Sequence, residues 1–262
     1  MVGPARCAIM FRRKPATYRP PFHRNASGQQ GKPAHCRLGA ISHLLKRLFD
    51  LLVSVSALLV LAPLLIVIAV WVKADSPGPV FYRGQRAGRG NRPFGIYKFR
   101  SMVADAESVG GSSTSGSDRR VTKSGRFIRK YKIDELAQLL NVVAGHMSLV
   151  GPRPEVLFYT SKYAGEYLEI FTVRPGITDW ASIWNADEGA VLAGARDADR
   201  AYEALIQPTK LRLQLRYVRE RSMLTDIRIL VHTLGRIINP DHVPRELSDT
   251  PPLAPGAGSD VP

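Results

Sequence analysis

Cysteine is scarce in this sequence of 262 residues, and its two copies, Cys7 and Cys36, both lie near the N-terminus. They form no disulfide framework and no metal-binding pattern, so we expect a reducing compartment. The six histidines are scattered without metal-ligand spacing. The chain also lacks a Gly-rich Walker loop and a dinucleotide fingerprint. If it binds a nucleotide, it does so without those two devices.

Acidic residues are absent from the first 49 positions, whereas the same stretch holds ten lysines and arginines. The whole chain carries 37 basic and 22 acidic residues, a formal net charge of +15, which predicts a polyanionic partner. Because much of the excess precedes an apolar run, it favours anionic membrane lipid over nucleic acid, for which no groove-reading motif is present. We expect residues 1–43 to be a disordered basic arm and the proline-rich residues 240–262 to be a disordered tail.

One long hydrophobic run stands out from the otherwise polar chain. Leu51–Val72 comprises 22 residues without a charge, which as a helix would reach about 33 Å, enough to cross a bilayer. Pro63 lies in its middle, where proline removes a backbone hydrogen bond and bends or breaks a helix. Basic residues flank both ends of the run. These features favour a re-entrant hairpin over residues 44–73, and a kinked helix that spans the membrane remains the alternative.

The following segment, residues 74–239, reads as one α+β domain that is rich in helix. Two short β-type runs, Pro79–Arg83 and Phe94–Phe99, are separated by a basic Gly-rich turn and predict a β-hairpin. Apolar residues recur at helical spacing over Ile133–Val143, and a second helical pattern covers Tyr202–Ile238.

Asp134 and Glu135 form the most suggestive acidic pair, because they follow a dense basic stretch over residues 119–132. Adjacent residues of a helix diverge by about 100°, so the two carboxylates cannot do the same job. One could attack a phosphorus atom while the other holds a divalent cation. The alternative is that both acids complement the helix dipole and pair with neighbouring arginines.

Two rigid turns each present a single arginine. Arg153 stands between two prolines and Arg174 precedes Pro-Gly, and such stiffness suits bidentate contact with a phosphate. Lys98 and Arg100 alternate with apolar residues, so we expect them to share one face of a strand as further substrate contacts. Each of these features could equally be a structural turn or an exposed strand face.

An ordered series of motifs resembles the catalytic domain of the monotopic phosphoglycosyl transferases, also called bacterial sugar transferases. The resemblance runs from about Lys46 to Ile238, nearly three quarters of the chain. Its strongest block is Ile133–Asn141 followed by Met147–Glu155. The other stretches that carry it are Lys46–Asp50, Pro77–Phe81, Tyr97–Met102, Ser124–Arg129, Arg174–Thr178 and the C-terminal positions Tyr217, Ser222, Asp226 and Thr233.

The resemblance implies ping-pong chemistry that depends on Mg²⁺. Asp134 would attack the β-phosphorus of a UDP-sugar, expel UMP and keep a phosphosugar. Polyprenyl (undecaprenyl) phosphate would then accept this group, while Glu135 would hold Mg²⁺. Basic side chains in the motifs would contact phosphate or nucleotide. With Arg100 added from the strand face, the expected substrate-binding residues are Lys98, Arg100, Arg129, Arg153 and Arg174.

The resemblance also implies a place in the cell. A re-entrant helix-break-helix, broken at Pro63, would hold the enzyme on the cytoplasmic face of the bacterial inner membrane. The reaction would be the first membrane step in the assembly of a surface glycan, such as an exopolysaccharide or lipopolysaccharide. A homodimer is left open.

The chain departs from the family pattern in a few places, of which the largest follows Thr178. There Asp179–Trp184 replaces a commoner Gly-Leu run, and we expect this change to bear on nucleotide or sugar choice. No departure removes a proposed catalytic group. The alternatives to an enzyme are a membrane-anchored scaffold of the same fold and a membrane-tethered nucleic-acid binder. The transferred sugar cannot be read from these residues.

Overall fold

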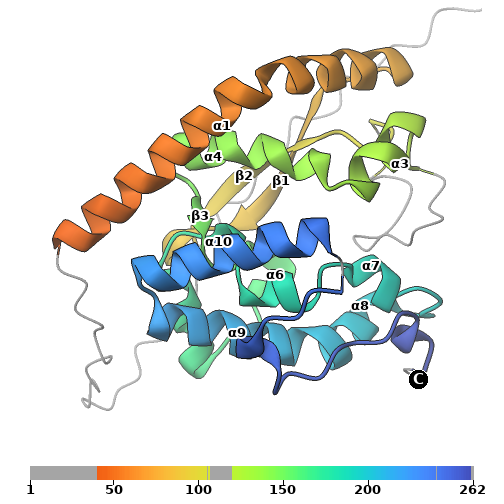
Figure 1. The fold of residues 1–262 in the computed structure, drawn as a ribbon. Helices are drawn as coiled ribbons and strands as arrows, with labels where there is room; N and C mark the ends of the chain where they lie inside the picture. The colour runs from red at the N-terminus through yellow and green to blue at the C-terminus, as the bar shows by residue number, and fades with distance from the viewer. Residues whose placement is uncertain (1–39, 105, 107–119, 240, 261–262) are drawn as a thin grey trace, which may run out of the picture. The chain divides into compact units, whose positions relative to one another are not determined.

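The computed structural model describes residues 40–104, 106, 120–239 and 241–260 of the chain (Figure 1). The predicted basic arm therefore lies outside the described residues, apart from positions 40–43. The described part is rich in helix and contains two small sheets, which confirms the expected helix-rich α+β class.

The long apolar run lies in α1 (Ala40–Asp75), a helix of 36 residues. At about 1.5 Å per residue it extends about 54 Å, more than the hydrocarbon core of a bilayer, which is about 30 Å thick. Within the described part of the chain, α1 is the one helix long and apolar enough to cross a membrane, and it indicates membrane association.

Pro63 lies inside α1 without ending it, and Figure 1 shows the ribbon changing direction partway along its length. The helix break that the sequence predicted at Pro63 is therefore not present, since α1 continues through this residue. A proline removes only one backbone hydrogen bond, and the turns on either side keep theirs.

The two sides of α1 have different surroundings. Asp50 and Ser54 near its start are buried, and so are Ile68 and Val72 near its end. The other side exposes large apolar side chains over most of the helix, a surface typical of contact with lipid. These side chains are Leu44, Leu48, Leu52, Val55, Leu59, Val60, Ile66, Val67 and Val70.

The predicted β-hairpin is present. β1 (Phe81–Ala87) and β2 (Pro93–Phe99) pair antiparallel over seven residues each. The turn between them, η1 (Arg89–Asn91), has Gly90 at φ 68°, a left-handed conformation that glycine adopts without cost to a side chain.

A second, parallel pair consists of β3 (Ser148–Val150) and β4 (Gly176–Thr178). Two glycines allow the backbones to meet just beyond β3. A Cβ on Gly176 would lie 2.1 Å from the backbone nitrogen of Gly151, so a larger residue does not fit. This contact places the turn that carries Arg153 against the start of β4.

The remaining helices are short, apart from two near the C-terminus. They are α3 (Lys123–Lys130), η2 (Ile133–Ala137), α4 (Gln138–Val143), α5 (Leu157–Thr160), η3 (Gly165–Thr172), α6 (Trp180–Trp184), α7 (Glu188–Val191), α8 (Ala198–Ala201), η4 (Tyr202–Ile206), α9 (Gln207–Glu220), α10 (Met223–Ile238), η5 (Arg245–Leu247) and η6 (Ala257–Asp260).

The helical pattern predicted over residues 202–238 is divided into η4, α9 and α10 in the structure. Ser222 begins α10, because its Oγ accepts the backbone N–H of Thr225 at 3.1 Å. A serine at this position satisfies an N–H group that the helix itself leaves without a partner.

The C-terminal tail, expected to be disordered, packs against the domain over residues 241–260. Leu247 is 2% exposed. The indole Nε1 of Trp184 donates to the carbonyl of Pro251 at 2.8 Å. The backbone N–H of Gly256 donates to the carbonyl of Ala190, also at 2.8 Å. The prolines lower the number of unfolded conformations, so few apolar contacts are needed to order this segment.

Lys46 of α1 lies between two buried aspartates. Its Nζ is 2.6 Å from Oδ2 of Asp226 on α10 and 3.8 Å from Oδ1 of Asp50 on α1. Ser148 Oγ donates to Asp50 at 2.8 Å, and Tyr217 OH donates to Asp226 at 2.8 Å. The two aspartate side chains are only 3% and 1% exposed, so one cation serves two acids removed from water. This network fixes the first part of α1 against β3, α9 and α10.

We predict that Lys46→Met lowers the free energy of unfolding by about 2 to 3 kcal/mol, because it leaves two buried carboxylates without a cation. The double variant Lys46→Met/Asp226→Asn should lose less, since one of the two charges is then gone. Lys73→Met, at the other end of α1 and exposed, is the control. Unfolding of the detergent-solubilised protein measures these differences, and equal losses from Lys46→Met and Lys73→Met would contradict the prediction.

Candidate active site

The acidic pair lies in η2, a 3₁₀ helix that follows α3. Lys132, directly before it, has φ 56° and ψ 21°, a left-handed conformation uncommon for a residue with a side chain. This residue turns the chain between α3 and η2. Because adjacent residues of a 3₁₀ helix diverge by about 120°, Asp134 and Glu135 face different surroundings.

Glu135 is held by two cations that the sequence had singled out. Its Oε1 accepts a hydrogen bond from Lys98 Nζ on β2 at 3.0 Å. Arg153 donates from Nη1 to Oε2 at 3.0 Å and from Nη2 to Oε1, a bidentate pair. Although burial alone would raise the pKa of Glu135, the pairs with Arg153 and Lys98 hold it well below its ordinary value. Glu135 is therefore a carboxylate at any pH near neutral.

The backbone of Arg153 is fixed from both sides. Its N–H donates to Oδ2 of Asp179 at 3.1 Å, and its carbonyl accepts from Nε2 of Gln214 at 3.2 Å. Asp179 is fully buried, and its Oδ1 also accepts the backbone N–H of Ser182 at 2.7 Å at the start of α6. Nothing in the sequence singled out Gln214, and Asp179 stood out only as part of a departure from the family pattern.

Asp134 is in a different electrostatic state from its neighbour. Its side chain is buried, at 8% exposure for the residue, and its Oδ1 has no hydrogen-bond partner in the part of the chain that the structure describes. Burial raises the pKa of Asp134, and Glu135 adds to the rise. The positive charges of Lys98, Arg129 and Lys132 partly oppose it. Of the predicted basic residues, Lys98, Arg129 and Arg153 thus surround the pair.

Arg100 and Arg174 are not brought to the acidic pair. β2 ends at Phe99, so the strand face that Lys98 and Arg100 were expected to share does not exist. The guanidinium of Arg100 donates instead to the carbonyl of Ser76 at 2.8 Å and to those of Val72 and Pro77, and so satisfies the end of α1. Nε of Arg174 donates to the carbonyl of Gly145 at 2.9 Å, just after α4. Both contacts are structural.

Lys210 of α9 is a buried cation that the sequence interpretation missed. Its Nζ donates to Oε1 of Glu188 at 2.8 Å and to the hydroxyl of Tyr202 at 3.1 Å, and it pairs with Glu155. Burial alone would lower the pKa of Lys210, but the two carboxylates raise it well above its ordinary value. Glu155 follows the Arg153 turn, so this network holds the far side of the turn. A lysine inside an apolar helical pattern was the signal for it in the sequence.

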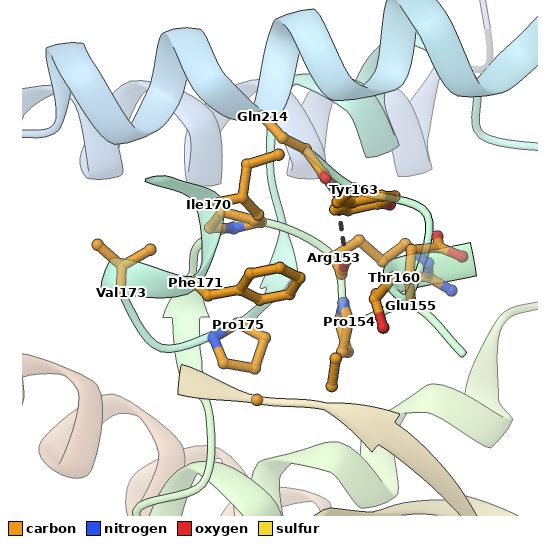
Figure 2. Close-up of a pocket in the computed structure, with 13 residues that line it drawn as sticks. Arg153, Pro154, Glu155, Thr160, Tyr163, Ile170, Phe171, Val173, Pro175 and Gln214 are labelled. Atoms are coloured by element: carbon orange, nitrogen blue, oxygen red, sulfur yellow. Dashed lines mark hydrogen bonds between the residues drawn. The ribbon is translucent and has the colours of Figure 1, made fainter. Parts of the chain in front are cut away.

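Figure 2 shows the side chains that converge behind the Arg153 turn, with Gln214 reaching from α9 to the backbone of Arg153. They enclose a cavity of about 20 Å³. This is room for about one water molecule and far too little for a sugar nucleotide. The cavity therefore belongs to the support of the turn.

The donor set at the pair consists of carboxylate oxygens. No group of three or more His, Cys, Asp or Glu side chains in residues 40–104, 106, 120–239 and 241–260 is arranged to hold a metal. A hard cation at Glu135 would thus need further oxygen ligands, which a phosphorylated substrate can supply. A carboxylate flanked by basic side chains, with a hard metal cation bound beside it, would suit phosphoryl transfer.

Curated relatives share this part of the chain. A protein of Aeromonas hydrophila named UDP-N-acetylgalactosamine-undecaprenyl-phosphate N-acetylgalactosaminephosphotransferase is 38% identical over 199 residues, which cover 74% of this chain and 44% of that protein. The UDP-glucose:undecaprenyl-phosphate glucose-1-phosphate transferase of Xanthomonas campestris pv. campestris is 39% identical over 197 residues, 74% of this chain and 38% of the relative. The chain thus spans less than half the length of these two proteins.

A shorter relative matches nearly end to end. The exopolysaccharide production protein PSS of Rhizobium leguminosarum bv. phaseoli is 39% identical over 197 residues, which cover 72% of this chain and 93% of that protein. The profile of the bacterial sugar transferase family matches residues 41–240, about three quarters of the sequence and the whole of the site described above. The chain therefore belongs to the bacterial sugar transferase family.

Proposed function

We propose that the protein transfers a sugar 1-phosphate from a UDP-sugar to undecaprenyl phosphate, giving a polyprenyl diphosphate sugar and UMP. The observation that carries this proposal is the pairing of a buried, cation-flanked carboxylate, Asp134, with a neighbour, Glu135, that is itself held as an anion. The names of the two longer relatives support the reaction, and the name of the shorter one supports a role in exopolysaccharide assembly.

The first half-reaction forms a bond between a carboxylate oxygen of Asp134 and the β-phosphorus of the UDP-sugar. The bond from that phosphorus to the oxygen bridging the two phosphates breaks, and UMP leaves with the electron pair. The positive charges of Lys98, Arg129 and Arg153 stabilise the negative charge that builds up on the diphosphate oxygens. Asp134 is then an acyl phosphate that carries the sugar.

The second half-reaction returns Asp134 to a carboxylate. An oxygen of undecaprenyl phosphate attacks the same phosphorus, and the bond to the aspartate oxygen breaks. The acceptor lipid keeps its phosphate at the membrane surface, where α1 holds the domain. Confining both reactants to this surface lowers the entropy cost of their encounter.

The donor set fits a magnesium ion. Glu135 Oε2 accepts a single hydrogen bond and Asp134 Oδ1 accepts none within the described residues, so hard oxygen lone pairs remain. Glu135 would hold the ion together with phosphate oxygens. When bound, it neutralises charge on the diphosphate.

We further propose that α1 enters and leaves the membrane on one side, the cytoplasmic face of the inner membrane. Both ends of the helix contact the same domain: Lys46 near its start pairs with Asp226, and Asp75 at its end accepts the N–H of Ser124 at 2.8 Å. Cations at both ends suit one anionic surface. The change of direction along α1 (Figure 1) then lets the exposed apolar side dip into lipid.

We predict that Asp134→Asn lowers UMP release at least about a hundredfold, because an amide cannot form the acyl phosphate. The assay uses purified protein, undecaprenyl phosphate, Mg²⁺ and a panel of UDP-sugars, since the relatives' names differ in the sugar. Labelled donor without lipid should leave phosphosugar on Asp134 of the wild type. The exposed Asp241→Asn is the control. UDP as product, or unchanged turnover of Asp134→Asn, would contradict the mechanism, and a wild type that releases no UMP from any donor would indicate a scaffold.

The pH dependence of the first half-reaction should report Asp134. Its pKa is raised, so activity should be lost as pH falls through a value above that of an ordinary aspartate, because only the carboxylate attacks. Glu135, whose pKa is depressed, is ionised throughout that range. Lys132→Gln should move the acid limb to higher pH, whereas Lys130→Gln should not. If the acid limb of the pH profile lay at the pKa of an ordinary aspartate in every variant, this would argue against Asp134 as the nucleophile.

Removal of divalent ions with EDTA should abolish UMP release, and added Mg²⁺ should restore it. Glu135→Gln should lower turnover at least about a hundredfold and raise the Mg²⁺ concentration that half-restores activity, because a charged ligand is lost. The exposed Glu166→Gln is the matched control. Full activity in EDTA would show that Glu135 has another task.

A further inference from the structure

Basic side chains from several elements gather around the start of α1. Arg47 on α1 donates to the carbonyls of Val142 at 2.8 Å and Val143 at 3.2 Å, at the end of α4. Arg174 donates to the carbonyl of Gly145 at 2.9 Å, just beyond that end. A Cβ on Gly145 would lie 3.6 Å from Nη2 of Arg47, so the two guanidinium groups lie close together.

Two further arginines come to this place from other parts of the chain. Arg89 lies in η1, which packs against η3, the helix that ends just before Arg174. Arg221 joins α9 to α10, and the ion pair of Lys46 with α10 holds the start of that helix beside the first turns of α1. Together these side chains form the arginine cluster: Arg47, Arg89, Arg174 and Arg221.

The arginine cluster has no acid to neutralise it. Within the described residues none of its members forms an ion pair, and Nε of Arg221 is buried without a hydrogen-bond partner. Burial lowers the pKa of Arg174, and the positive charges of Arg47 and Arg89 lower it further. At His43, which lies on α1 one turn before Arg47, burial and the charges of the other three members also lower the pKa.

Positive charges held this close repel one another, so an anion among them would stabilise the fold. The acid that acts on Arg174 is Asp50, and it already pairs with Lys46 and accepts from Ser148. A guanidinium group carries five N–H donors in a planar fork that matches a phosphate, so Arg47 and Arg174 keep donors after binding their carbonyls. The cluster is therefore suited to a phosphate from outside the chain.

The apolar surface beside the cluster narrows the choice of ligand. Leu44 and Leu48 precede and follow Arg47 on α1, and they are 70% and 51% exposed. They belong to the side of α1 whose surface is typical of contact with lipid. We propose that the arginine cluster binds the phosphate of an anionic membrane phospholipid, whose acyl chain lies along Leu44 and Leu48.

This site is separate from the one that transfers the sugar phosphate. The acidic pair lies in η2, before the start of α4, whereas Arg47 and Arg174 bind carbonyls at and beyond the end of α4. The phospholipid does not react there. It fixes the start of α1 at the membrane surface, and with it the orientation of the domain, because its phosphate contacts α1, the hairpin turn and the α9–α10 junction at once.

The test uses the whole chain in non-ionic detergent, freed of lipid, with dioctanoyl phosphatidylglycerol as the probe and native mass spectrometry to measure its Kd. Arg89→Gln/Arg221→Gln removes two charges from the cluster. Arg196→Gln/Arg212→Gln removes two exposed arginines outside it and is the charge-matched control. We expect the cluster variant to raise the Kd at least about tenfold and the control to change it less than about twofold. An equal loss in both would show general attraction to a basic protein and overturn the proposal.

Two other probes separate the sources of phosphate. Inorganic phosphate should bind the wild type at least about tenfold more weakly than phosphatidylglycerol, because it has no chain to lie along α1. Dioctanoyl phosphatidylcholine should also bind at least about tenfold more weakly, because its headgroup has no net charge. Equal binding of inorganic phosphate would indicate a site for the free ion, and equal binding of phosphatidylcholine would indicate the apolar surface alone. Either result overturns the proposal.

Thermal unfolding distinguishes a ligand site from a part of the fold. Without lipid, Arg89→Gln/Arg221→Gln should unfold at the same temperature as the wild type or a higher one, because repulsion is relieved. Phosphatidylglycerol should then raise the unfolding temperature of the wild type more than that of the variant. A lower unfolding temperature of the variant without lipid would show that the two side chains hold the fold, and would also overturn the proposal.

Discussion

One lysine holds the membrane helix on the domain that carries the acidic pair. Lys46 neutralises Asp226 and Asp50, two side chains almost removed from water. Two buried acids without a cation would cost several kcal/mol, so the start of α1 cannot leave α10 and β3 without exposing or protonating them. The far end of α1 is held by Arg100, which binds its last carbonyls, and by Asp75, which binds the start of α3. An apolar helix anchored at both ends on one domain supports attachment to one side of a membrane.

The site places two adjacent carboxylates in different surroundings, which shift their pKa values in opposite directions. The 3₁₀ geometry of η2 turns Glu135 toward Lys98 and Arg153, which hold it ionised, and turns Asp134 into a buried position that raises its pKa. A nucleophile needs an anion that is not tied up in a strong ion pair, and a ligand for a cation needs a permanent charge. The structure separates the two environments over one peptide bond, by burial at Asp134 and by ion pairs at Glu135.

Much of the domain serves to hold the Arg153 turn. Asp179 and Gln214 bind its backbone, the glycine contact between Gly151 and Gly176 fixes its base, and Lys210 holds the residues that follow it. The segment after Thr178 begins at Asp179, whose contact with the backbone of Arg153 relates it to the position of that arginine. Its bearing on nucleotide or sugar choice stays a prediction.

The sequence by itself determined the family, the α+β class, the apolar helix, the hairpin and the acidic pair, because these depend on local order: a 22-residue uncharged run, β-type runs around a glycine-rich turn, and motifs in series. It could not decide which basic residues reach the pair. Arg100 and Arg153 were both expected to contact the substrate, yet one closes the end of α1 and the other binds Glu135. Nor could it foresee that α1 continues through Pro63. Only the tertiary structure decided these points, because the direction of a side chain depends on which carbonyl or carboxylate packing brings within its reach.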